Sequence, residues 1–232
     1  TVGNSHYLNL ESYFQLDGLA YKIVPIRTSI QSYGNDGSVN SDVLYENIME
    51  TFHWGGLDTD PEKIYMDENN RRFVMNFKSS FLSLAEQLIK ENKNEKAEKV
   101  LDKCFSLFDN EIAPYSYYDL LLADLYYQID KKEKGSEIMK TAADLFFDEL
   151  DYYMTLKDEH LAGISDDVGR LALMFEETFN MLYKEGEIEI ANEYAIQAFE
   201  LIDERFAFGL TLSQLTTREA QQNWYMSLSE YE

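Results

Sequence analysis

The residues that most often carry catalysis or bind metals are sparse and scattered in this chain. The three histidines, His6, His53 and His160, lie far apart, and Cys104 is the only cysteine. A zinc site needs several such ligands at short spacing, so the histidines are predicted to be solvated or packed side chains. No Ser-His-Asp set, glycine-rich phosphate loop or Cys-His pair is recognisable. The sequence therefore predicts no catalytic residue, no metal site and no cofactor.

One short motif has a spacing that can hold a divalent ion. Asp58-Thr59-Asp60 is an Asp-x-Asp string of the kind that many sugar-nucleotide transferases use for this purpose. A hard cation needs more oxygen ligands than this string supplies. Asp60 also directly precedes Pro61, and proline suits the first position of a helix. A helix cap is therefore the favoured interpretation.

The string HWGGL, residues 53–57, allows two interpretations of Trp54. An aromatic ring beside two glycines could form a platform for a sugar or a peptide. Alternatively, Trp54 anchors the N-terminal segment against the first helical pair, and the glycines end the preceding helix. Large aromatic side chains mostly contribute buried area, which favours the second interpretation. Trp54 is also kept as a candidate binding residue.

Adjacent arginines and several tyrosines complete the set of candidate binding residues. Arg71 and Arg72 stand at a predicted helix start, where cations oppose the helix dipole, so a partner group is expected to hold them. Internal carboxylates are favoured over an external anion. Tyr117, Tyr126 and Tyr153 lie on successive predicted helices. Core packing is the default for each of them, and contact with a peptide in a helical groove is the alternative.

The chain has two parts that differ in composition and in apolar pattern. Residues 1–66 contain most of the glycines and prolines, and Tyr21–Ile26 is predicted as an edge strand. Asn40 is predicted to cap a short helix, one face of which carries Val43, Leu44, Ile48 and Phe52. From Asp67 onward the pattern is helical almost throughout, beginning with an apolar stripe at Phe73, Phe77, Phe81, Leu84 and Leu88. A capping box of Ser116 and Asp119 is predicted to start a later helix.

Small residues recur at regular places in the helical part. Ala85 and Leu88, then Ala97 and Cys104, fit the two helices of a tetratricopeptide unit of about 34 residues. A second set and a looser third set follow at corresponding positions: Leu122, Ala123, Tyr126, Gly135, Met139 and Ala142, then Phe179, Leu182, Ala191, Ala195 and Ala198. A generic helical bundle is the alternative.

The predicted fold is therefore mostly α, a tetratricopeptide-like superhelix of antiparallel helix pairs with a short mixed N-terminal segment. Residues 1–66 are expected to pack on the repeats, and residues 67–232 to form them. The three pairs run from Asp67 to about Ala207, and a capping helix spans Ser213 to Tyr231, with a Thr216–Glu219 capping box before Trp224.

Composition excludes several classes of partner. The 20 Lys and Arg against 43 Asp and Glu give a formal net charge of −23. Such a surface repels phosphate backbones and anionic headgroups, so binding to nucleic acid or to a membrane surface is not expected. No apolar run approaches the ~18 residues that a membrane span needs. Because the chain starts at Thr1 without Met, it is expected to be a mature or excised piece of a longer protein.

Several strings together resemble a known family. YFQLDGLAYKIVPI is followed by VNSDVLYENIM, HWGGLD and IYMDENNRRF, and the most specific parts are Leu16–Ile26 and Asp67–Phe73. The chain resembles the C-terminal soluble region of multi-spanning membrane proteins common in Bacteroidetes, which are related to protein O-mannosyltransferases. In that family the catalytic acidic residues lie in the membrane part, so the resemblance carries no catalytic residue over to this chain.

The resemblance implies a periplasmic appendage of a membrane glycosyltransferase rather than the transferase itself. The expected function is a non-catalytic docking module whose helical groove binds a protein or peptide partner. The alternative is a domain that contacts the glycan or the acceptor through Trp54, tyrosines, Arg71 and Arg72.

Overall fold

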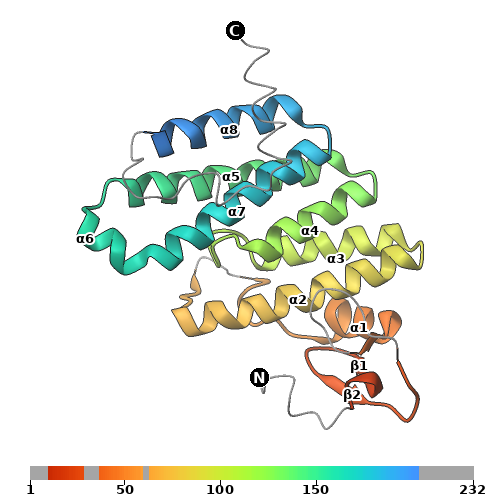
Figure 1. Cartoon of the computed structure of the whole chain (residues 1–232). Coiled ribbons are helices and arrows are strands. Elements are labelled where there is room, and N and C mark those ends of the chain that lie inside the picture. Colours follow the sequence, from red (N-terminus) through yellow and green to blue (C-terminus); the bar gives the residue numbers. More distant parts are fainter. Residues whose placement is uncertain (1–9, 29–36, 60–62, 204–232) are drawn as a thin grey trace. The chain divides into compact units, whose positions relative to one another are not determined.

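The computed structural model describes residues 10–28, 37–59 and 63–203. The chain divides into two compact units, unit 1 (Thr1–Ile129) and unit 2 (Asp130–Glu232). The described residues are mostly helical, with a small three-stranded sheet near the N-terminus (Figure 1). The predicted boundary near residue 66 lies inside unit 1, so the N-terminal segment belongs to the same compact unit as the first long helices.

The N-terminal sheet consists of three short strands, β1 (Phe14–Leu16), β2 (Tyr21–Ile23) and β3 (Ser38–Val39), in the order β2-β1-β3. β1 pairs antiparallel with β2 and parallel with β3. The predicted edge strand is confirmed over Tyr21–Ile23, and it ends before Pro25, which cannot donate to a ladder. Gly37 has φ 83°, and a Cβ there would collide with the Phe14 carbonyl, so only glycine suits this entry into β3.

A short helical segment links the sheet to the long helices. The helix α1 (Ser41–Glu46) is capped as predicted, because the Asn40 side chain accepts a hydrogen bond from the Val43 amide. It continues into a π-helical turn, η3 (Asn47–Thr51). Leu44 and Ile48 are fully buried, but Val43 is exposed. The prediction for Val43 is wrong, because it lies about 100° around the helix from Leu44.

The long helices follow in the expected order. Unit 1 contains α2 (Glu68–Lys90), α3 (Asn94–Leu107) and α4 (Tyr117–Gln128). Unit 2 contains α5 (Lys132–Met154), the short α6 (Asp158–Leu161) and η5 (Ala162–Ile164), then α7 (Ser165–Lys184) and α8 (Ile188–Asp203). The predicted capping box of Ser116 and Asp119 starts α4. The predicted capping helix, with Trp224, and the Asp60-Pro61 cap lie outside the described residues.

Three helix-to-helix turns share one backbone conformation. Asn92, Asp130 and Gly186 each have a positive φ, at 59°, 61° and 80°, directly after α2, α4 and α7. The Lys93 amide bonds the Leu88 carbonyl at 2.8 Å, and the Glu187 amide bonds the Leu182 carbonyl at 2.9 Å. These are the bonds of a Schellman ending, which reverses the chain after a helix. The successive helix pairs α2–α3, α4–α5 and α7–α8 are called the first, second and third hairpins below, and the turn residue gives them a common register in the sequence.

Equivalent positions in this register are buried. The residues four positions before the turn are Leu88, Tyr126 and Leu182, and those five positions after it are Ala97, Gly135 and Ala191. All six are buried, as the predicted repeat positions require, whereas Phe179 and Ala195 of the looser third set are only partly buried. The side chain of Ala198 lies outside the described residues.

The apolar stripe predicted for α2 is correct only after its first turns. Phe81, Leu84 and Leu88 are fully buried, whereas Phe73 is 58% exposed. Helical spacing places residues on one face, but it does not show how far along that face the neighbouring helices extend.

Ala97→Leu is expected to destabilise the protein by ~1–3 kcal/mol, because Ala97 is fully buried on α3 and added methylenes overpack a closed interior. Urea unfolding measures the effect. Lys99→Leu, an exposed position of the same helix, is the control and should leave the midpoint nearly unchanged. An Ala97→Leu protein that unfolds at the midpoint of the parent would show that the register is wrong.

Candidate functional site

Trp54 lies in the core of unit 1, as the second interpretation of HWGGL predicts. Its side chain is 8% exposed, and its indole Nε1 donates to the Ile48 carbonyl at 3.4 Å. Four phenylalanine rings from the N-terminal segment, α2 and the end of α3 surround it: Phe52, Phe77, Phe81 and Phe108. The N-terminal segment therefore packs against the first helical pair through an aromatic cluster.

A lysine strengthens the same attachment. Lys103 of α3 donates from Nζ to the carbonyls of Ile48 and Met49 in η3, at 3.0 and 3.1 Å. These carbonyls belong to the π-helical turn. Partial burial lowers the pKa of Lys103, although the nearby Asp58 carboxylate opposes this shift. The indole of Trp54 and the ammonium of Lys103 thus meet at the same carbonyl, that of Ile48.

The other candidate residues are not gathered at one place. Arg71 and Arg72 are exposed in the first turns of α2, and Tyr117 is exposed at the start of α4. Tyr126 is buried, and its hydroxyl donates to Asp102 Oδ1 at 2.7 Å, which links α4 to α3. Tyr153 belongs to unit 2. The structure thus places Trp54 and Tyr126 in the core of unit 1, and the binding roles of the six residues stay predictions.

The hydroxyl of Tyr153 is held by its own helix. It donates to Glu149 Oε1 at 2.6 Å, one turn earlier on α5. This hydrogen bond, with a smaller contribution from burial, raises the pKa of Tyr153 to about 12. Tyr153 is therefore a neutral phenol near physiological pH. Its ring also contacts that of Tyr152, which is exposed at the end of α5.

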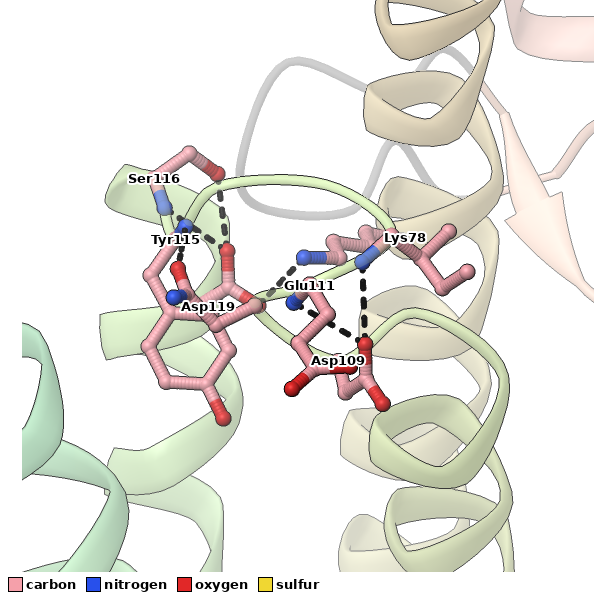
Figure 2. Close-up of polar contacts among 8 residues, drawn as sticks. Lys78, Asp109, Glu111, Tyr115, Ser116 and Asp119 are labelled. Carbon is pink, nitrogen blue, oxygen red and sulfur yellow. Dashed lines mark hydrogen bonds and ion pairs between the residues drawn. The ribbon is translucent and has the colours of Figure 1, made fainter. Parts of the chain in front are cut away.

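A buried ion pair is the main polar feature that the sequence did not predict. Lys78 Nζ of α2 and Asp119 Oδ1 of α4 lie 2.6 Å apart, with side chains 1% and 0% exposed. Asp119 Oδ2 accepts from the amide and the hydroxyl of Ser116, at 2.8 and 2.9 Å. The Lys78 ammonium also lies 5.6 Å from the Tyr115 ring centroid. Figure 2 shows the lysine reaching the start of α4, where the capping box holds the carboxylate.

Asp119 of the ion pair stands at a register position where the other two hairpins have an aromatic residue. Eleven residues before the turn, the first and third hairpins carry the buried Phe81 and Phe175, whereas the second carries Asp119. Both oxygens of this carboxylate are engaged, so it is not available to a substrate. The arrangement fixes α4 against α2 and has no reacting group.

The other groups that could react are also covered. Cys104 is fully buried, and burial raises the pKa of its thiol above the ordinary range, so it is not a thiolate nucleophile. Within residues 10–28, 37–59 and 63–203, no group of three His, Cys, Asp or Glu side chains is placed to hold a metal ion. None of the helices in these ranges combines the length and apolar composition that crossing a bilayer requires.

The face of α7 opposite its buried side has the properties of a contact surface. One stripe of this helix, spaced by three, four and three residues, contains Leu173, Glu176, Asn180 and Tyr183, and it is called the outer stripe of α7 below. Leu173 is 53% and Tyr183 40% exposed. Burial, and next the adjacent Glu177 carboxylate, raise the pKa of Glu176 to about 7, although a hydrogen bond with Asn180 lowers it.

A related carboxylate lies on α2. Glu86 is almost buried, and burial raises its pKa, while Lys90 one turn later acts in the opposite direction. Glu86 lies six residues before its turn, and Asp124 and Asn180 occupy the same place in the other hairpins. The first helix of each hairpin therefore presents an acid or an amide at one register position.

Glu176→Gln is expected to stabilise the protein at pH 8 by about 1 kcal/mol, with no difference near pH 4. In the folded protein the Glu176 carboxyl keeps its proton up to about pH 7, whereas in the unfolded chain it releases the proton near pH 4.5. The folded state therefore loses stability as the pH rises from 4.5 to about 7. Urea unfolding at several pH values measures the difference. A variant that is equally stabilised at pH 4 and pH 8 would contradict the assignment.

Comparison with known proteins gives a match in the N-terminal segment. Residues 1–43 match the model of the family described as TMEM260-associated domain 2. The described part of this match contains β1, β2, β3 and the first residues of α1. No curated protein and no solved structure matches the chain. The N-terminal segment thus resembles a domain that is associated with TMEM260.

Proposed function

We propose that this chain is a non-catalytic docking module that binds a protein or peptide partner in the groove of its helical repeats. The observation that carries the proposal is the outer stripe of α7, which presents exposed apolar and tyrosine side chains beside a carboxylate. The common turn register supports a tetratricopeptide-like array, and such arrays bind extended segments. No catalytic constellation competes with this function among the described residues.

The module is proposed to be the periplasmic appendage of a membrane protein related to O-mannosyltransferases, and to hold an acceptor or partner near it. The match of residues 1–43 to TMEM260-associated domain 2 supports this relation. A glycan-contacting domain is the alternative, and it relied on Trp54 as a sugar platform. Because four phenylalanine rings surround Trp54, docking is favoured over glycan contact.

Affinity capture from envelope and secreted fractions of the native organism tests the proposal. The immobilised chain should retain a specific protein, and retention should weaken as salt rises, because a net charge of −23 favours basic partners. The denatured chain is the control. Equal retention by native and denatured chain would contradict docking, as would sustained turnover of a lipid-linked or nucleotide-linked sugar by the isolated chain.

A further inference from the structure

The outer stripe of α7 contains a carboxylate oxygen that lacks a donor. Oε2 of Glu176 is buried and has no hydrogen-bond partner among the described residues. Asn180 bonds to this carboxylate from one turn later. A buried polar atom without a partner is costly, and natural proteins rarely keep one without a reason. The free oxygen therefore calls for a donor from outside the helix.

The cations of α7 itself do not fill this role. Arg170 Nη2 pairs with Asp167 Oδ1 at 2.7 Å, and Lys184 Nζ pairs with Glu185 Oε1 at 3.2 Å. One turn before Leu173, a Cβ added to Gly169 would meet no atom within 4 Å. The same helix face thus offers an acceptor oxygen without a donor, and open space at its N-terminal end.

We propose that Glu176 receives the ammonium or guanidinium group of a lysine or arginine from the docked partner. Leu173 and Tyr183 then pack against apolar residues of the partner, which lie on either side of its lysine or arginine. The ten-residue separation of Leu173 and Tyr183 corresponds to roughly 15 Å along the helix, which an extended segment of about five residues spans. The net charge of −23 favours a basic segment. The proposal rests on the proposed docking function and names its partner chemistry.

A peptide titration of the full chain tests the proposal. The probe is the acetylated and amidated pentapeptide Leu-Gly-Lys-Gly-Leu, in which both leucines and the lysine lie on one face of an extended chain. Its matched control carries norleucine in place of lysine. Amide NMR signals of residues 173–183 are followed. The lysine peptide should shift them to saturation, and the norleucine peptide should bind at least tenfold more weakly. Glu176→Gln should weaken the lysine peptide at least tenfold, and Glu177→Gln by less than threefold.

Other results would overturn the proposal. These are equal binding of the two peptides, unchanged affinity in Glu176→Gln, or no saturable shift with the lysine peptide. Signals that change with the concentration of the chain alone would assign the stripe to a second copy, and signals that change on removal of residues 204–232 would assign it to that segment. If the Glu176→Gln chain captures the same protein as the parent in the affinity experiment, this inference is wrong and the proposed docking function stands. If the parent chain captures no specific protein, the docking function itself is wrong.

Discussion

Lys78→Ala is expected to destabilise unit 1 by about 3–5 kcal/mol. The lysine and its partner Asp119 are 1% and 0% exposed, and their charged atoms lie 2.6 Å apart. Removing the ammonium leaves a carboxylate buried between α2 and α4, with only the donors of Ser116 to compensate it. Urea unfolding followed by the fluorescence of Trp54, in a Trp224→Phe background so that Trp54 is the only emitter, measures the loss.

The double variant Lys78→Met with Asp119→Phe separates the cost of an unpaired buried carboxylate from the net contribution of the ion pair. It removes both charges and restores the aromatic residue that the first and third hairpins carry at this register position. Buried ion pairs are often no more stabilising than well-packed apolar residues, so the double variant should recover most of the loss. A Lys78→Ala protein within 1 kcal/mol of the parent would show that the pair is not buried as described.

Trp54→Ala is expected to cost about 3–5 kcal/mol, since the indole is 8% exposed and four phenylalanine rings surround it. The variant also removes the donor to the Ile48 carbonyl. Thermal unfolding followed by circular dichroism measures the change. Tyr65→Ala, at a side chain 86% exposed, is the matched control and should change stability little. Equal stability of the Trp54→Ala variant and the parent would contradict the packing of the N-terminal segment on α2.

The hairpin register could be predicted because small residues at close contacts leave a sequence signal. Ala97, Gly135 and Ala191 recur at equal distances from the turns, and all are buried. The turns themselves were harder to predict. All three turn residues, Asn92, Asp130 and Gly186, adopt a positive φ, but only the last of them is a glycine. Asn and Asp tolerate this conformation better than other residues, but neither type requires it.

The polar interior could not be predicted in the same way. The capping box of Ser116 and Asp119 is a local motif and was recognised, whereas the partner Lys78 lies 41 residues earlier. Pairing across such a distance depends on how α2 and α4 pack, which no local spacing encodes. Lysine is also almost never fully buried unless it is paired, so nothing local in the sequence marks Lys78 as a buried residue.

The candidate binding residues show the same limit. Trp54 could be assigned to packing because large aromatics favour burial, and the structure confirms its burial. The outer stripe of α7 was missed, because helical spacing alone does not show which carboxylate oxygen lacks a donor. The sequence signal was the pair Glu176-Glu177 directly after the apolar run 171–175, and the structure places Glu176 on the stripe with Leu173 and Tyr183.

Amide hydrogen exchange of the full chain, alone and with the protein that it captures, tests the docking account most directly. The account predicts slower exchange in residues 173–184 of α7 when the partner is bound. Residues 94–107 of α3 serve as the internal reference and should exchange at the same rate in both samples. Unchanged exchange in α7, or protection confined to α3, would contradict the account.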